Sequence, residues 1–413
     1  MRRVALATLV VLLVFGLIFA EQILRVGAAE WMYKKFPIEE AAKRFEAAHP
    51  GVKVKLLKVT EFDQSMLMAM KAGRTNYDLL MPYSGGSMVK FIKLGTIVPL
   101  DDVFNNPKYK VDGRLLQKTD FLQGFLKSGI YNGKVYALPV FGEVQVLGYR
   151  KDYLKEAGVE PPKTWAELEM AARLLTKDKD GDGTTDIYGY STCWSRITLL
   201  YTFFAAVKAR GGRLLDEKGN LSFRDPITID TLKWFVKMRN KYKAAQPDVH
   251  EVYNNSRDAF KAGKVALFHN WHSWCLESGL VFGPEKLGIV PLPKTGETGT
   301  MIYMGGVIVP KAGNVELAKQ FIVEMIESKW FQQWSYKHYG KMPVTRQNLE
   351  GLEGEYWDEL ISAVDNGEDL PAYEDLLKMS DTAEKYLRLA WTGQMDPEEA
   401  CERIYKEISR MRK

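Results

Sequence analysis

One carboxylate stands out between two apolar, strand-like runs near the middle of the chain. Residues 135–141 read VYALPVF and residues 144–150 read VQVLGYR, and Gly142 and Glu143 join them. Two such strands in succession suit a chain that passes from one lobe of a protein to another, which would place the Glu143 carboxylate at the crossing point. No catalytic motif accompanies this carboxylate, so we expect the region to hold a ligand rather than transform it.

A second group of oxygen-bearing side chains lies in the segment DKDGDGTTDIYG, residues 178–189. Asp178, Asp180, Asp182, Thr184 (through its backbone) and Asp186 fall at positions 1, 3, 5, 7 and 9 of a calcium-binding loop, with glycine at position 6. Position 12, which should supply a bidentate glutamate, is a glycine. Two interpretations therefore stay open. The loop holds a structural calcium ion, or it is a tight polar turn with left-handed glycines.

Aromatic residues follow three of the predicted strands directly. Trp31 comes after ILRVGAA, Tyr83 and Ser84 end YDLLMPYS, and the strand VALFHNW closes in the cluster Trp271-His272-Ser273-Trp274. Strands alternate with helices along the chain, which predicts an α/β sheet covered by helices on both faces. Because ligands of such sheets sit beyond the carboxyl ends of the strands, these aromatic residues mark an expected binding edge.

Local signals also position individual helices. Thr164 precedes Glu167 by three residues, the spacing of a capping box, and predicts a helix start there. Asn314 is expected to cap one long helix that runs through Trp334. The length of 413 residues predicts two or three domains, and the absence of a long flexible linker indicates that two lobes share chain segments.

The N-terminus is typical of an export signal. Arg2 and Arg3 precede an uncharged run from Val4 to Ala20, so we expect cleavage after Ala20, with an uncleaved membrane anchor as the alternative. Loss of the two arginines takes the formal net charge from +5 to +3, which argues against nucleic-acid binding. The three cysteines are expected to be buried free thiols; one bridge, between Cys193 and Cys275, is the alternative.

Four sequence blocks together resemble a known family. They are YDLLMPYSGG (77–86), GKVYALPVFGEVQVLGYRKDYLKEAGVEPPKTWAELEMAARLL (133–175), AFKAGKVALFHNWHSW (259–274) and MGGVIVPKAGNVELAKQFIVEMIES (304–328), followed by GKMPVTR (340–346). In this order they resemble the family 1 extracellular solute-binding proteins of ABC importers, the group that contains maltose-binding protein.

The resemblance implies a two-lobed, type II periplasmic-binding-protein fold with discontinuous lobes. Residues 21–141 and 304–345 would form the N-terminal lobe, and residues 142–303 and 346–413 the C-terminal lobe. The implied hinges lie near Val140–Glu143 and Tyr303–Gly306, with a third crossing after Pro343. The lobes would close around the ligand by hinge motion.

The resemblance also implies the function: a periplasmic or extracellular monomer, not an enzyme, that captures a carbohydrate and delivers it to a membrane permease without needing a cofactor. Glu143 matches a sugar-hydroxyl acceptor, and the block around Trp271 matches the position of a stacking aromatic. The residues expected to contact the ligand are Trp31, Tyr83, Ser84, Glu143, Trp194, Trp271, His272, Trp274, Tyr303 and Gly305.

Two other functions stay open. A glycoside hydrolase would need a second carboxylate that flanks the scissile bond. The same fold could also bind a phosphorylated polyol or a polyamine, and Lys34, Lys35 and Arg196 are the cations that would suit an anionic ligand.

Overall fold

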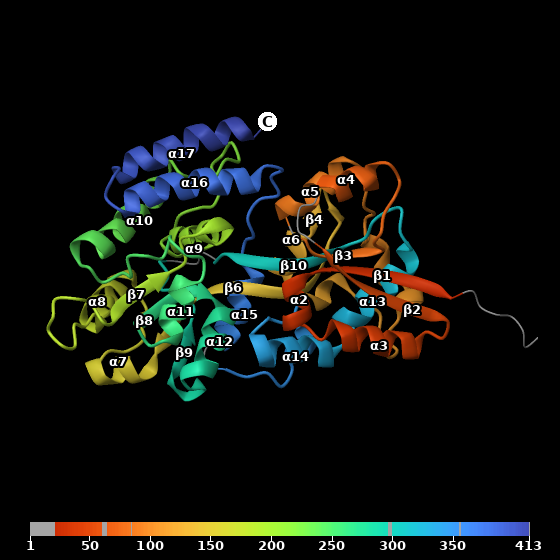
Figure 1. The fold of residues 1–413 in the computed structure, drawn as a ribbon, viewed down its shortest axis with the longest axis horizontal. Coiled ribbons are helices and arrows are strands. Elements are labelled where there is room, and N and C mark those ends of the chain that lie inside the picture. The colour runs from red at the N-terminus through yellow and green to blue at the C-terminus, as the bar shows by residue number, and fades with distance from the viewer. Residues whose placement is uncertain (1–20, 60–63, 84, 296–299, 355–356, 413) are drawn as a thin grey trace, which may run out of the picture.

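The computed structural model describes residues 21–59, 64–83, 85–295, 300–354 and 357–412. Two groups of strands and helices lie side by side, and two strands run from one group into the other (Figure 1). The predicted signal, residues 1–20, and the predicted ligand contact Ser84 fall outside the described residues. Within the described ranges, no helix has both the length and the apolar character that crossing a membrane requires.

The strands form one large mixed sheet whose order is β2-β1-β3-β10-β6-β8-β7, with β9 beside β6 and a separate β4-β5 hairpin. The parallel pairs are β1 with β2, β1 with β3, and β7 with β8, whereas β10 and β6 run antiparallel to their neighbours. The strands are β1 (Gln22–Ala29), β2 (Val52–Val59), β3 (Leu79–Tyr83), β4 (Ile130–Tyr131), β5 (Lys134–Val135), β6 (Leu138–Arg150), β7 (Tyr188–Thr192), β8 (Val265–Trp271), β9 (Leu287–Val290) and β10 (Ile302–Ile308).

Helices cover both faces of the sheet, which confirms the predicted α/β, two-lobed class (Figure 1). We call β1–β3 with their helices the first lobe, and β7–β9 with theirs the second lobe. The helices are α2 (Glu30–Lys35), α3 (Ile38–Ala48), α4 (Gln64–Lys71), α5 (Gly85–Lys93), α6 (Gln123–Ser128), α7 (Lys151–Ala157), α8 (Trp165–Leu175), α9 (Arg196–Ala209), α10 (Pro226–Val236), α11 (Asn255–Lys261), α12 (His272–Phe282), α13 (Val315–Glu327), α14 (Lys329–Tyr339), α15 (Trp357–Asp365), α16 (Leu376–Trp391) and α17 (Pro397–Met411).

The two lobes are connected by β6 and β10. Every residue of β6 is buried, because this strand pairs with β10 along its first half and with β8 and β9 along its second. A third segment joins the crossing: the backbone of Gly142 exchanges two hydrogen bonds of 3.0 Å with Met342. The carboxyl ends of β1, β3 and β8 therefore meet the same central region, as the strand pattern predicted.

The local helix signals were partly correct. At α8 the Thr164 hydroxyl accepts from the Glu167 N–H at 3.1 Å, and the Glu167 carboxylate accepts from the Thr164 N–H at 3.3 Å, so the capping box is confirmed. Asn314 does cap α13, but the single helix through Trp334 was wrong. The helix ends at Glu327 because Ser328 leaves the helical conformation and its hydroxyl accepts from the Phe331 N–H, which starts α14.

The cysteines confirm the favoured expectation. Cys193, Cys275 and Cys401 are all buried and free. Burial raises the pKa of Cys193 and of Cys401 to about 12, so both thiols stay protonated at neutral pH.

Candidate functional site

The site is built on the crossing of β6 and β10. Tyr303 lies opposite Glu143 and Gly305 opposite Phe141 in the antiparallel register, and Trp271 of β8 lies opposite Gln145. Side chains that oppose each other across antiparallel strands project to the same face of the sheet. The sheet therefore gathers aromatic rings and one carboxylate on a single face, where the lobes meet. We call this region the junction.

Aromatic rings form a continuous row across the junction. The Trp31 ring on α2 meets Phe141 edge-on at 5.8 Å between centroids, and Phe141 lies 6.0 Å from Tyr303. Tyr303 lies 6.4 Å from Trp271, and Tyr201 of α9 contacts both, at 6.0 and 4.9 Å. The row therefore begins in the first lobe and ends in the second, and two of its rings, Trp31 and Tyr303, are only half-buried.

Two glycines let the strands cross beneath these rings. A β-carbon on Gly305 would lie 1.9 Å from the Phe141 ring, and one on Gly142 would lie 1.9 Å from the Phe125 ring of α6. Neither position can carry a side chain without displacing an aromatic residue. For Gly305, one of the predicted contact residues, this close approach accounts for the residue type.

Glu143 is held by two side chains that the sequence did not connect with it. The Ser273 hydroxyl donates to Oε1 at 2.9 Å, and the Lys341 ammonium pairs with the same oxygen. The side chains of Lys341 and Glu143 are only 7% and 5% exposed, so this ion pair is buried. The other carboxylate oxygen, Oε2, is buried and receives no hydrogen bond from any described residue. One acceptor of Glu143 thus remains for a hydrogen-bond donor.

A second ion pair spans the junction. Lys35 of α2, in the first lobe, pairs with Glu277 of α12, in the second, and Arg257 lies 3.7 Å from the same carboxylate. Burial lowers the pKa of Lys35, the nearby Lys341 cation lowers it further, and Glu277 opposes both effects. Because one partner comes from each lobe, this pair can form only when the lobes are together.

Asp369 joins three parts of the junction and was not predicted. It accepts from the Tyr201 hydroxyl at 2.5 Å, from the N–H of Leu370 at 2.7 Å and from the N–H of Met304 at 3.3 Å. Desolvation raises the pKa of Asp369 to about 6, and these hydrogen bonds only partly offset it. No local pattern marks this aspartate in the sequence, since its partners are distant along the chain.

The remaining predicted residues lie outside the aromatic row. Trp194 is buried inside the second lobe, 4.6 Å from Trp391. Tyr83 ends β3 and packs edge-on against Phe91. Trp274 lies 5.4 Å from Tyr253, beneath the Arg257 guanidinium. His272 stacks on Tyr336 of α14, and burial lowers its pKa to about 4. A ligand role for these four residues stays a prediction.

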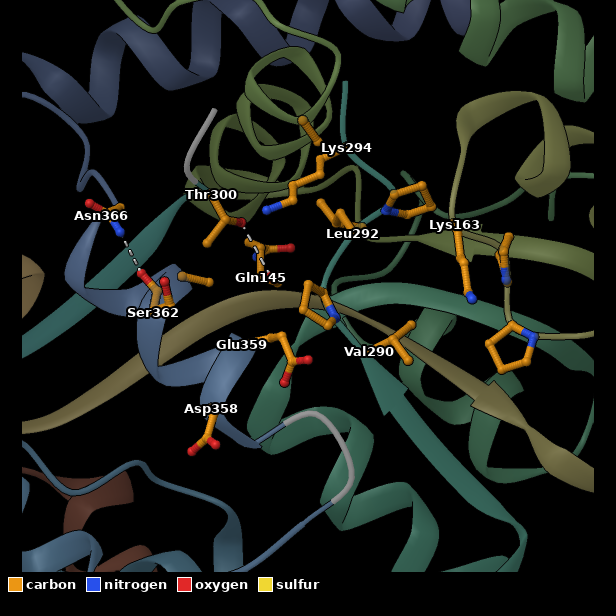
Figure 2. A pocket seen from close by; sticks show the side chains of 16 residues that line it. Gln145, Lys163, Val290, Leu292, Lys294, Thr300, Asp358, Glu359, Ser362 and Asn366 are labelled. Carbon is orange, nitrogen blue, oxygen red and sulfur yellow. Dashed lines mark hydrogen bonds between the residues drawn. The ribbon is translucent and has the colours of Figure 1, made fainter. Parts of the chain in front are cut away.

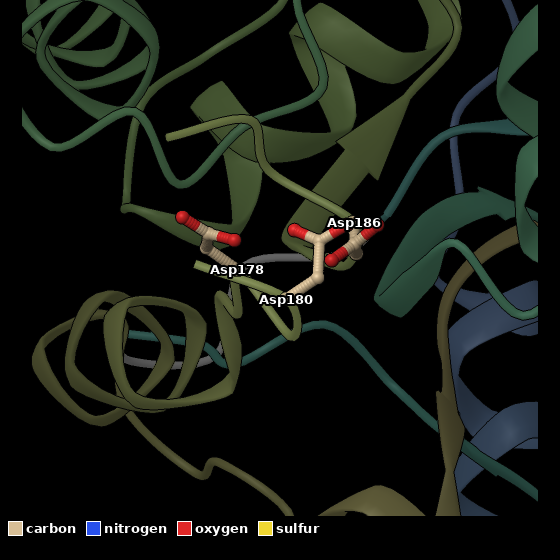
Figure 3. Close-up of side chains that lie close together, drawn as sticks. All are labelled: Asp178, Asp180 and Asp186. Atoms are coloured by element: carbon tan, nitrogen blue, oxygen red, sulfur yellow. The ribbon is translucent and has the colours of Figure 1, made fainter. Parts of the chain in front are cut away.

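The acidic loop lies in the second lobe, apart from the junction. Carboxylate oxygens of Asp178, Asp180 and Asp186 lie within 4.8 Å of one another, and all three residues are exposed (Figure 3). Asp178 already accepts from the N–H groups of Gly181 and Gly183, both at 2.8 Å. The missing twelfth ligand has a steric reason, because a β-carbon on Gly189 would lie 1.7 Å from the Ala172 carbonyl oxygen. The donor set suits calcium, but it is incomplete.

Comparison with known proteins agrees with this architecture. Residues 35–330 match the family of bacterial extracellular solute-binding proteins. The maltooligosaccharide ABC transporter solute-binding lipoprotein of Streptococcus pneumoniae is 24% identical over 385 residues, which cover 89% of this chain and 84% of that protein. The maltotriose-binding protein of Pyrococcus abyssi is 27% identical over 256 residues, which cover 62% of this chain and 50% of that protein.

Solved structures repeat the fold. Maltose-bound MalE3 of T. maritima superposes with a TM-score of 0.75 at 22% identity, over 94% of this chain and 99% of that one. With most of its length matched in sequence and nearly all of it in structure, this chain belongs to the bacterial extracellular solute-binding proteins.

Proposed function

We propose that this protein captures a neutral carbohydrate, an oligosaccharide, at the junction and delivers it intact to an ABC permease. The observation that carries the proposal is the aromatic row from Trp31 to Trp271 beside a buried carboxylate with one unused oxygen. The C–H faces of a sugar ring pack on flat aromatic rings, and a sugar hydroxyl can donate to Glu143 Oε2. Relatives named for maltooligosaccharide and maltotriose support the same ligand class.

The geometry indicates how capture would work. Opening about β6 and β10 would separate Lys35 from Glu277 and uncover the rings and Glu143. Closure would return both charges to contact and exclude water from the ligand's polar groups, which strengthens those hydrogen bonds. The predicted lobe boundaries, at 141/142, 303/304 and 345/346, are part of this proposal.

The charges of the junction favour a neutral ligand over the two charged alternatives. Lys35 and Lys341, which could have held a phosphate, each already pair with a glutamate. Glu143 and Glu277, which could have held a polyamine, are the carboxylates in those pairs. A charged ligand that used these lysines or glutamates would compete with an existing ion pair, and this competition opposes its binding.

Titration calorimetry with maltose, maltotriose, glycerol 3-phosphate and spermidine tests the proposal. We expect heat from at least one saccharide and none from the two charged ligands, and small-angle scattering should show compaction with the bound saccharide. Glu143→Gln should weaken saccharide binding at least tenfold, about 1.4 kcal/mol. Tight binding of only a charged ligand would reject the ligand class, and release of products from a labelled oligosaccharide would identify a hydrolase instead.

The proposal also covers location and ions. We infer that residues 1–20 direct export and that the protein acts as a monomer outside the cytoplasm.

No cofactor is needed for capture, and any calcium at the acidic loop would be structural. Added calcium should then raise the melting temperature of the wild type but not of Asp178→Asn, and EGTA should reverse the shift. An equal effect on both proteins would exclude this loop as the calcium site.

A further inference from the structure

A cavity lies beside β6 (Figure 2), and of its lining residues only Gln145, which pairs with Trp271 in the sheet register, was named for the junction above. Its volume is about 490 Å³, which is large enough for a small organic molecule. Six parts of the chain build it: Gln145 of β6, the turn 161–163 before α8, Ala209 at the end of α9, the segment 290–294 at the end of β9, Thr300 before β10, and α15 with the following Asn366.

Gln145 is the polar group at the centre of this cavity (Figure 2). The residue is 1% exposed, yet neither its side-chain oxygen nor its side-chain nitrogen bonds to a described residue. Its backbone is fully engaged, since the N–H donates to the Met301 carbonyl and the carbonyl accepts from the Thr300 hydroxyl. Buried amides normally have partners, so the free amide indicates a ligand that offers both a donor and an acceptor.

Charges of opposite sign stand on opposite sides of this amide. In Figure 2, Lys294 lies on one side of Gln145, and Glu359 lies on the other together with Asp358. Lys163 is a further cation on the lining. Among the described residues, none of these four side chains forms an ion pair with another. The walls between them are apolar and include Leu292 and Pro293.

We propose that this cavity binds a zwitterionic molecule of dipeptide size. Its carboxylate would face Lys294, its ammonium would face Glu359 and Asp358, and its amide would pair with the Gln145 side chain. An apolar side chain of the ligand would pack on Leu292 and Pro293. The groups that carry this proposal, the Gln145 amide and the charged lining residues, are not assigned to saccharide capture, so the two proposals can fail separately.

The test uses glycyl-leucine as the probe, followed by saturation-transfer NMR and titration calorimetry on the full mature protein. Acetyl-glycyl-leucinamide, which keeps the amide but lacks both charges, is the matched ligand control. We expect glycyl-leucine to bind at least tenfold more tightly than the capped peptide. Gln145→Met should weaken glycyl-leucine at least tenfold without lowering the melting temperature, because the native side chain makes no hydrogen bond to the described residues.

Variants of the charged lining residues distinguish recognition of the ligand's charges from a loss of folding. Lys294→Met and Glu359→Gln change exposed residues and should each weaken glycyl-leucine several-fold, whereas Lys337→Met, an exposed lysine on α14, should leave it unchanged. The proposal is overturned by any of three results. The first is no saturation transfer at about 10 mM glycyl-leucine, a concentration well above the millimolar range of weak binding. The second is equal binding of the capped peptide, and the third is unchanged binding of glycyl-leucine to Gln145→Met.

Discussion

Replacing Lys341 by methionine should destabilise this protein far more than replacing an ordinary lysine. Methionine keeps the length of the side chain and removes the charge, which leaves Glu143 buried at 5% exposure with the Ser273 hydroxyl as its one remaining partner among the described residues. Removing one partner of a buried ion pair typically costs about 3–5 kcal/mol, because the remaining charge is no longer compensated. We expect a loss in that range.

Urea unfolding followed by tryptophan fluorescence measures this loss, and a double-mutant cycle identifies its cause. Glu143→Gln alone leaves the Lys341 ammonium buried without its carboxylate and should cost a similar amount. The double variant has neither charge, so its loss should be smaller than the sum of the single losses by about 2 kcal/mol or more. Lys337→Met, an exposed lysine on α14, is the control and should change the free energy of unfolding by less than about 0.5 kcal/mol.

Two results would refute this reasoning. One is a Lys341→Met variant as stable as the Lys337→Met control, and the other is a double variant whose loss equals the sum of the single losses. Either result would mean that the pair is not coupled in the folded protein. The cycle also matters for function, since the effect of Glu143→Gln on ligand binding can be interpreted only when its effect on stability is known.

Three further predictions concern the junction. Trp271→Phe should weaken saccharide binding at least tenfold by calorimetry with little loss of stability, whereas Trp271→Ala should also lose about 3–5 kcal/mol in urea, because Trp271 is 6% exposed. Gly305→Ala should lower the free energy of unfolding by about 1–3 kcal/mol, because the added methyl would lie 1.9 Å from the Phe141 ring. Adding Phe141→Leu to this variant should restore part of the lost stability. An unchanged urea midpoint in Gly305→Ala would contradict the close approach. Asp369 has a pKa of about 6 in the folded protein, above the ordinary value of 3.8, so the folded state holds this proton more tightly. The free energy of unfolding should therefore fall as the pH rises between these two values. Urea unfolding at pH 4 to 7 should show a smaller fall for Asp369→Asn than for the wild type, and an unaltered pH dependence would contradict the assignment.

The sequence by itself determined the elements and the family. Local rules placed the start of α8, because the capping box of Thr164 and Glu167 involves groups only three residues apart. The alternation of strands and helices placed Trp31 just beyond one strand and Trp271 at the end of another, and both side chains do lie in the aromatic row. A local rule also failed where two signals competed, since Ser328 began a new helix inside a pattern that predicted one.

Only the tertiary structure decided what surrounds these residues. Glu143 and Lys341 are 198 residues apart, so no spacing along the chain could show that the predicted acceptor is already half occupied. Position along the chain also could not distinguish Trp194 from Trp271, because each tryptophan lies at the end of a strand or just beyond it. In the structure, Trp194 packs on Trp391 in the interior, whereas Trp271 reaches the junction. The cavity around Gln145 likewise exists only because β6, α15 and the segment after β9 pack together. The sequence determines the chemistry of each side chain, but packing between residues far apart along the chain decides which side chains contact one another.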